Sequence, residues 1–321
     1  MKAKISPTMT SYCQLPREKS QKRKRPRVLI AFSLPSVPLL NLPFDVSHPE
    51  VVDAVRRALL EDVGSGDVTT EFCIPRDIRC GARMIARQNL RIAGVELIPV
   101  IFEALAPRAC QFEMQRESGA RLTPGDEIIT VIGPARVLLT GERTALNFVQ
   151  RLSGIATLTT AYVDAVRGTD CQILDTRKTT PGLRRLEKMA VAAGGGVNHR
   201  MGLYDAVLIK NNHIEAVGGV TAALERTQTA SVPVEIEVRT RAELDEALNW
   251  GATHLLLDNL SPEEAKEWVR YIAGRAKVEL SGGITLEAVR AYAESGADFI
   301  SVGALTHSAP AVDINFRLDL D

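Results

Sequence analysis

The chain is predicted to be an α/β protein of 321 residues, in which a parallel α/β barrel follows a smaller N-terminal α+β unit. Two observations support this expectation. After Cys171, short apolar runs alternate with helical stretches, which is typical of parallel strands joined by crossover helices. Before Pro134, short β-like runs are interspersed with few helices, which favours an α+β unit. A long helical pattern over 138–166 is expected to bridge the two regions.

The N-terminal unit is expected to begin near Ser47. His48 and Pro49 predict a helix start, because proline suits the first helical turn. The apolar residues Val52, Val55 and Leu59 then recur at helical spacing, up to an end near residues 61–64. The remaining elements expected in this unit are β-like runs over 82–86, 111–115 and 127–131, and a helix over 97–105.

Six apolar runs are expected to form the parallel strands of the barrel. They cover 172–174, 206–209, 234–238, 254–257, 278–280 and 299–302. Because the carboxyl ends of parallel barrel strands form one face, side chains at these ends are expected to share one cleft. The residues concerned are Arg177 and Lys178, Lys210, Glu237 within its run, Asp258, Ser281 and Gly303.

Charge is distributed unevenly along the chain. The formal net charge is zero, yet the segment up to Asn41 holds nine basic residues and one acidic residue, so it carries +8 and the rest −8. An acidic body argues against a nucleic-acid footprint over the fold. We expect residues 1–46 to be a disordered extension, with a nuclear signal or an organelle transit peptide as alternatives. The barrel domain is expected to cover 151–321 and the N-terminal domain 47–150.

The sequence favours a cytoplasmic protein that does not span a membrane. No apolar run approaches the ~20 residues of a membrane span. The five cysteines lack zinc-site spacing, so reduced thiols and no structural zinc are expected.

A cluster of cations is the most informative local feature. Arg177, Lys178, His199, Arg200 and Lys210 fall within 171–214, around a run of three glycines. Cations between apolar strands are expected to converge on a polyanion that carries phosphates and carboxylates, for which the fork of arginine is specific. The alternatives are a structural ion pair for Lys210 and a solvated loop for His199 and Arg200.

Two carboxylates are expected in the same cleft. Glu237 and Asp258 either form salt bridges with Lys210 or Arg177, or hold Mg²⁺ and stabilise positive charge that develops on a sugar. Both roles are compatible in turn.

Glycine turns and one arginine outside the barrel complete the candidate site. The turn Ser281, Gly282 and Gly283 and the turn at Gly303 are predicted to bind phosphate through backbone amides. Arg143, at the start of the long helix, either is merely solvent-exposed or acts across a subunit boundary.

The ordered motifs resemble those of the quinolinate phosphoribosyltransferase family, the type II phosphoribosyltransferases also called nicotinate-nucleotide pyrophosphorylases (carboxylating). The similarity covers the chain from about Ser47 to its end. It is carried by EDVGSGDVTT, LTGERTALNFVQRLSGIATLT, DTRKTTPGLRRLEKMAV, GGGVNHRMGLYDAVLIKNNHI, LLLDN, ELSGGI and SVGALTHS.

The resemblance implies an incomplete α/β barrel beside an N-terminal α+β sandwich domain, in a homodimer or a multiple of it. It implies that quinolinate and 5-phosphoribosyl 1-diphosphate give nicotinate mononucleotide, diphosphate and CO₂ in NAD biosynthesis, with Mg²⁺. It assigns Arg177, His199 and Arg200 to the quinolinate carboxylates, together with Arg143 from the partner subunit. Lys178 and Lys210 are assigned to substrate anions, and Glu237 and Asp258 to ribose and Mg²⁺. The residues assigned to phosphate are Ser281, Gly282, Gly283, Gly303 and His307.

Two other functions remain open at this point. One is a related phosphoribosyltransferase that acts on another pyridine or base, which would leave part of the Arg/His set without a partner. The other is a non-catalytic phosphate-binding barrel, against which the presence of both Glu237 and Asp258 argues.

Overall fold

The computed structural model describes residues 41–319, so most of the expected extension 1–46 lies outside the described residues. Residues 41–46 contact the folded domain. The backbone N–H of Leu42 donates to Asn198 Oδ1 (3.1 Å), and Leu42, Phe44 and Val46 pack against the hydrophobic core.

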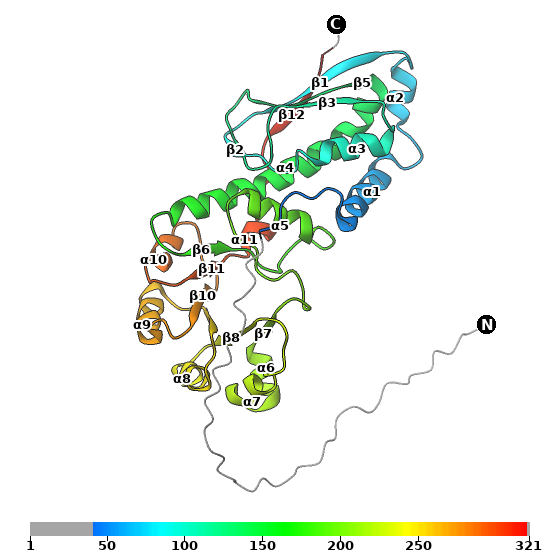
Figure 1. The fold of residues 1–321 in the computed structure, drawn as a ribbon. Helices are drawn as coiled ribbons and strands as arrows, with labels where there is room; N and C mark the ends of the chain where they lie inside the picture. Colours follow the sequence, from blue (N-terminus) through cyan, green and yellow to red (C-terminus); the bar gives the residue numbers. More distant parts are fainter. Residues whose placement is uncertain (1–40, 320–321) are drawn as a thin grey trace, which may run out of the picture. The chain divides into compact units, whose positions relative to one another are not determined.

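The N-terminal region forms an antiparallel sheet with helices packed beside it (Figure 1). The strand order is β12-β1-β5-β3, and β2 and β4 form a separate two-stranded ladder. The elements here are α1 (Pro49–Val63), α2 (Val68–Cys73), β1 (Arg79–Ala86), β2 (Leu90–Arg91), α3 (Leu97–Leu105), β3 (Gln111–Met114), β4 (Arg121–Leu122) and β5 (Glu127–Pro134).

Helix α1 begins and ends as the sequence predicts. The His48 ring accepts a hydrogen bond from the Glu50 backbone N–H, and Gly64 ends the helix at φ +54°. Val55 and Leu59 are buried as expected, but Val52 is 45% exposed and its neighbour Val51 is buried in its place.

Helix α4 (Ala135–Ala165) is the bridging helix that the sequence predicts, and it starts three residues earlier than expected. It contacts α1 and α3 of the N-terminal region and α5 of the barrel region (Figure 1). Two glycines permit this close packing. A Cβ at Gly141 would collide with the Phe102 ring, and a Cβ at Gly154 would collide with the backbone of Pro310.

The second region is a parallel sheet of six strands in the order β6-β11-β10-β9-β8-β7. Its elements are β6 (Gln172–Leu174), α5 (Arg184–Ala193), β7 (Val207–Ile209), α6 (Asn211–Val217), α7 (Val220–Glu225), β8 (Val234–Val238), α8 (Arg241–Trp250), β9 (His254–Asp258), α9 (Pro262–Ile272), β10 (Lys277–Ser281), α10 (Val289–Ala293), β11 (Phe299–Ser301) and α11 (Ala304–His307).

The six strands coincide with the six predicted runs to within one residue at either end. In the part of the chain that the structure describes, no ladder joins the outer strands β6 and β7, so the barrel is incomplete. The α/β fold class expected from the sequence is therefore confirmed.

The last strand, β12 (Ile314–Asp319), leaves the barrel and pairs antiparallel with β1. The antiparallel sheet of the N-terminal region therefore contains one strand from the end of the chain. The pairing is reinforced by Arg83, which forms ion pairs with Asp319 (2.7 Å) and Glu127 (2.6 Å).

Candidate active site

A cavity of about 520 Å³ lies at the carboxyl ends of the parallel strands. Eight of the predicted site residues line it: Arg177, Lys178, His199, Arg200, Lys210, Glu237, Asp258 and Ser281. The other lining residues are Asp175, Thr176, Leu208, Leu256, Glu279 and Ser301. The cavity therefore has cations on the side of β6 and β7 and carboxylates on β8 to β10.

The arginines of this cavity lack protein carboxylates as partners within the described residues. Arg177 Nε is buried and has no hydrogen-bond partner there. Arg200 donates only to a backbone oxygen, that of Ala206 (3.0 Å). Burial lowers the pKa of Arg200, and the neighbouring charge of Arg177 lowers it further. Two guanidinium groups held close together, neither in an ion pair with a carboxylate of the described residues, form a site for an anion.

A cavity of similar size elsewhere shows the contrast. This second cavity, of about 480 Å³, is lined by residues of α1, α4 and α5. In it, Arg151 forms an ion pair with Glu187 (2.9 Å). Glu187 also accepts hydrogen bonds from Thr180. Because this arginine already has a protein carboxylate as partner, the cavity at the strand ends is the better candidate for an anionic ligand.

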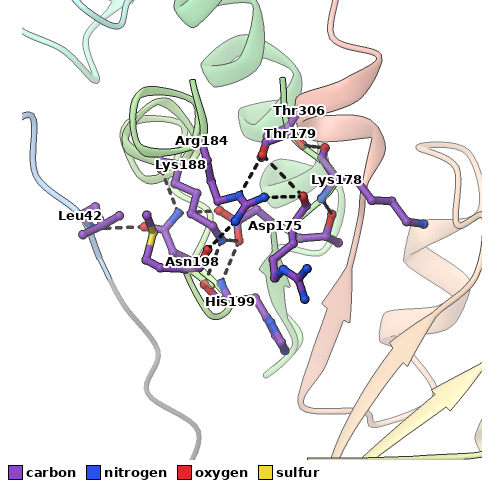
Figure 2. Close-up of polar contacts among 12 residues, drawn as sticks. Leu42, Asp175, Lys178, Thr179, Arg184, Lys188, Asn198, His199 and Thr306 are labelled. Atoms are coloured by element: carbon purple, nitrogen blue, oxygen red, sulfur yellow. Dashed lines mark hydrogen bonds and ion pairs between the residues drawn. The ribbon is translucent and has the colours of Figure 1, made fainter. Parts of the chain in front are cut away.

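A buried network holds the backbone of His199 from both sides (Figure 2). The His199 N–H donates to Asp175 Oδ1 (2.8 Å), and Lys188 Nζ donates to the His199 carbonyl oxygen (2.9 Å). Lys188 and Asp175 also form an ion pair, and both side chains are fully buried. Burial raises the pKa of Asp175 and lowers that of Lys188, and the opposite charge of the partner counteracts each shift.

Asn198 extends this network to residues 41–46. Its Nδ2 donates to Asp175 Oδ2 (2.8 Å) and to the Lys188 carbonyl oxygen (2.8 Å), while its Oδ1 accepts from Leu42 N–H. The segment that presents His199 and Arg200 to the cavity is therefore held by side chains from β6 and α5 and by the residues before α1.

The His199 ring contacts buried carboxylates. Its Nε2 lies 3.0 Å from Glu235 Oε2 and 3.5 Å from Glu279 Oε2. Burial raises the pKa of Glu235 to about 7 and that of Glu279 to about 8, and the Glu235 charge adds to the shift of Glu279. His254 lies 3.5 Å from Glu235 Oε1, and burial lowers its pKa to about 4.

Lys210 and Glu237 form only a long contact. Lys210 Nζ lies 3.7 Å from Glu237 Oε2, with the lysine side chain 52% exposed and the glutamate 8% exposed. An exposed amine at this distance contributes little to stability, so the structural ion pair is the weaker interpretation of Lys210. Asp258, at the end of β9, accepts a hydrogen bond from Asn259 (2.6 Å).

Five predicted residues do not line the cavity: Arg143, Gly282, Gly283, Gly303 and His307. The two turns adjoin it. Gly282 has φ +107° and leaves no room for a Cβ beside Asn259, and a Cβ on Gly303 would meet both His307 and Lys178. Arg143 is exposed on α4, outside the cavity of its own chain.

Sequence reasoning missed the residues beneath the cavity, although one signal for them was present. Strands buried on both faces usually read as continuous apolar runs. The runs VEIEV (β8) and KVELS (β10) instead place Glu235 and Glu237, and Glu279 and Ser281, two residues apart. This period of two indicates a polar barrel interior. Asp175 and Lys188 carried no such signal.

Comparison with known proteins gives the same assignment for both regions. Residues 67–153 match the family model "Quinolinate phosphoribosyl transferase, N-terminal domain" and residues 155–317 match the C-terminal domain model. The chain belongs to the quinolinate phosphoribosyltransferase family.

Named relatives are similar over most of the chain. A nicotinate-nucleotide pyrophosphorylase [carboxylating] from Mycobacterium leprae is 45% identical over 273 residues, which covers 83% of this chain and 96% of the relative. A chloroplastic protein of the same name from Arabidopsis thaliana is 41% identical and covers 86% of this chain and 85% of the relative. The solved structure of the Francisella tularensis nicotinate-nucleotide pyrophosphorylase superposes with a TM-score of 0.81 at 36% identity, covering 85% and 98%.

Within 41–319 no helix is both long and apolar enough to cross a bilayer.

Proposed function

We propose that the protein transfers the phosphoribosyl group of 5-phosphoribosyl 1-diphosphate to quinolinate with decarboxylation, giving nicotinate mononucleotide, diphosphate and CO₂ for NAD biosynthesis. The observation that carries the proposal is the cavity itself. It combines two arginines that form no ion pair within residues 41–319 with two carboxylates on the opposite strands. A dianionic pyridine beside a phosphorylated sugar matches that distribution of charge.

Quinolinate is proposed to lie on the cationic side. Arg177, His199 and Arg200 bind its two carboxylates, and the rigid support of His199 keeps these groups in place before substrate arrives. Arg143 is proposed to complete the set from the partner subunit of a homodimer. Its exposure outside its own cavity is consistent with that role, and exposed Val68 and Phe72 on neighbouring α2 offer apolar area that a second copy would cover.

Phosphoribosyl diphosphate is proposed to lie on the carboxylate side. The backbone turns at Ser281–Gly283 and Gly303, with His307 beside the latter, bind phosphate, while Lys178 and Lys210 neutralise the diphosphate. Glu237 and Asp258 fit Mg²⁺, because this ion takes one or two carboxylates and completes its shell with water and substrate phosphate oxygens. When bound, Mg²⁺ supplies charge neutralisation to the leaving diphosphate.

The chemistry asks mainly for orientation and electrostatics. As the bond from C1 of the ribose to diphosphate breaks, C1 becomes oxocarbenium-like next to Glu237 and Asp258, whose negative charges stabilise it. The pyridine nitrogen, held by the arginines, then attacks C1. The quaternised ring acts as an electron sink for the loss of CO₂ from the carboxylate next to the nitrogen, and the electron pair left on that ring carbon takes up a proton from water to give nicotinate mononucleotide.

A direct assay tests the function. Purified protein with quinolinate, phosphoribosyl diphosphate and Mg²⁺ is expected to release CO₂ and nicotinate mononucleotide in equal amounts. Turnover of nicotinate in place of quinolinate would favour a phosphoribosyltransferase for another pyridine. Binding of phosphoribosyl diphosphate without turnover of either acid would favour the non-catalytic barrel.

The cytoplasm is proposed as the location of the protein. The Arabidopsis relative is described as chloroplastic, so a basic segment that is poor in acidic residues keeps organelle import as the alternative for residues 1–46. Microscopy of the full chain fused at its C-terminus to a fluorescent protein decides between the two.

A further inference from the structure

Four titratable side chains meet in the barrel interior beneath the cavity. His199, Glu235, His254 and Glu279 are each less than 7% exposed. One oxygen from each carboxylate and one nitrogen of the His199 ring lie within 4.8 Å of one another. Because buried charges are costly unless they are paired, this cluster requires an explanation beyond packing.

The strand register explains how the cluster forms. Glu235 and Glu237 lie two residues apart on β8 and therefore point to the same side of the sheet. Glu237 and Glu279 both pair with Leu256 of the intervening strand β9, so they belong to one layer of the barrel. Glu235 lies one layer deeper, away from the carboxyl ends of the strands.

Glu235 has its short contact with His199 rather than with His254. The distance from its carboxylate to His199 Nε2 is 3.0 Å, against 3.5 Å to His254 Nε2, which has no hydrogen-bond partner within 41–319. His254 is instead stacked on Phe299, with 5.5 Å between the ring centroids. The carboxylate of Glu235 is thus directed at the residue that lines the cavity.

This contact determines which edge of the His199 ring can meet a ligand. With Nε2 turned toward Glu235 and Glu279, only Nδ1 remains, and it has no hydrogen-bond partner among the described residues. The backbone of His199 is fixed independently by Asp175 and Lys188 (Figure 2). A ring with a fixed backbone and one fixed nitrogen has a single orientation toward the cavity.

We propose that Glu235 is a positioning residue that holds His199 with Nε2 toward the barrel interior, so that Nδ1–H donates to a carboxylate of the bound pyridine. The proposal rests on the proposed function for the identity of that pyridine. A ring held in this orientation presents the edge that carries Nδ1 to the substrate, and an N–H at that edge hydrogen-bonds to a carboxylate more strongly than to a neutral acceptor. Glu235 would thereby contribute to selectivity for a diacid without touching it.

Three variants test the role of Glu235. Glu235→Leu removes the acceptor, Glu235→Gln keeps an acceptor oxygen without the charge, and His254→Gln removes a neighbour of Glu235 that does not contact the cavity, as a matched control. Loss of a buried hydrogen bond to a charged group is expected to raise KM for quinolinate about 10- to 100-fold in Glu235→Leu. The rise is smaller in Glu235→Gln and absent in His254→Gln, while KM for phosphoribosyl diphosphate is unchanged in all three.

Equal rises in both KM values, or an effect of His254→Gln as large as that of Glu235→Leu, would show a merely structural role and overturn the proposal. So would a tightly bound divalent metal that is present in wild-type protein and lost in Glu235→Leu, because the cluster would then be a metal site.

Nitrogen-15 NMR of the histidine rings separates this proposal from the proposed function. The His199 signals, assigned by their absence in His199→Gln, are expected to show a hydrogen-bonded Nε2–H that is lost in Glu235→Leu. An unchanged Nε2 signal in that variant refutes the positioning role. If wild-type protein shows the expected signal and does not turn over quinolinate, the proposed function fails and the positioning of His199 stands.

Discussion

Replacing Lys188 by methionine should expose the cost of an unpaired charge beneath the active site. Lys188 and Asp175 are both fully buried, and the lysine makes hydrogen bonds to Asp175 and to the His199 carbonyl oxygen. Removing one partner of a buried pair costs about 3–5 kcal/mol, because the other charge remains without compensation. Methionine fills a similar volume, so little of the loss should come from a cavity.

The expected change in melting temperature follows from the size of the fold. An unfolding entropy of about 2.1 cal/mol/K per residue gives roughly 0.6 kcal/mol/K for the described part of the chain, so Tm should fall by about 5–9 °C. Urea denaturation and differential scanning calorimetry at pH 8 measure both quantities. Because Asp175 supports the backbone of His199, KM for quinolinate should rise as well.

The deficit should depend on pH with a definite sign. Burial already raises the pKa of Asp175, and loss of the Lys188 charge raises it further. A carboxyl whose pKa is higher in the folded than in the unfolded state binds more protons when folded, so the variant loses stability as pH rises through that window. The gap between wild type and Lys188→Met should therefore be smaller at pH 5.5 than at pH 8.

Two controls make the test decisive. Lys277→Met removes an exposed pair with Asp298 and should cost less than about 1 kcal/mol. The double variant Asp175→Asn with Lys188→Met leaves no charge at either position of the pair and should recover part of the loss. If Lys188→Met costs no more than Lys277→Met, or if its deficit does not grow with pH, the buried pair does not stabilise the site in the way argued.

Four further predictions concern the cavity and its surroundings. Lys210→Ala should lower kcat about 100-fold or more with little change in Tm, because its amine is half exposed; a low Tm with full activity of the folded fraction would restore the structural ion pair. Asp258→Asn should weaken the Mg²⁺ dependence of turnover, and an unchanged Mg²⁺ titration would exclude that role. Inactive Arg143→Ala and Lys210→Ala proteins, refolded together, should regain about a quarter of wild-type activity in mixed dimers, whereas an inactive mixture would place Arg143 in its own subunit's site. Deleting residues 1–40 should leave KM for quinolinate unchanged. Deleting residues 1–46 should raise it, because this deletion removes the Leu42 N–H that donates to Asn198. Equal KM values for the two deletions would refute a contribution of Leu42 to the position of His199.

The fold was predictable because its local patterns agree with its topology. The barrel strands are short, mainly apolar runs with a polar residue or a glycine at or near the carboxyl end, and parallel strands bring those ends to one face whatever the details of packing. The position of Lys210, Glu237, Asp258 and Ser281 around one cavity follows from that rule alone.

The supporting network could not be predicted in the same way. Lys188 lies in the charged stretch RRLEK of α5, which is typical of a solvated helix face, and its burial depends on Asp175 thirteen residues earlier. Helical periodicity predicts which residues share a face of the helix, but it does not predict whether a carboxylate from another element packs against that face. The pairing of β12 with β1 could not be predicted either, because no local pattern identifies a partner strand more than two hundred residues away.

Because β12 belongs to the N-terminal sheet, that sheet cannot be completed until the last residues of the chain have been synthesised. In the finished sheet β1 lies between β5 and β12, so during synthesis it has an open edge until residues 314–319 leave the ribosome. Throughout translation of the barrel, that edge can pair with another nascent chain, and contacts of such long sequence separation form slowly. A frameshift confined to β12 would therefore leave every barrel residue intact and still yield a protein prone to aggregate. The changed residues would lie at the end of the chain, whereas the exposed strand edge would belong to β1 in the N-terminal region.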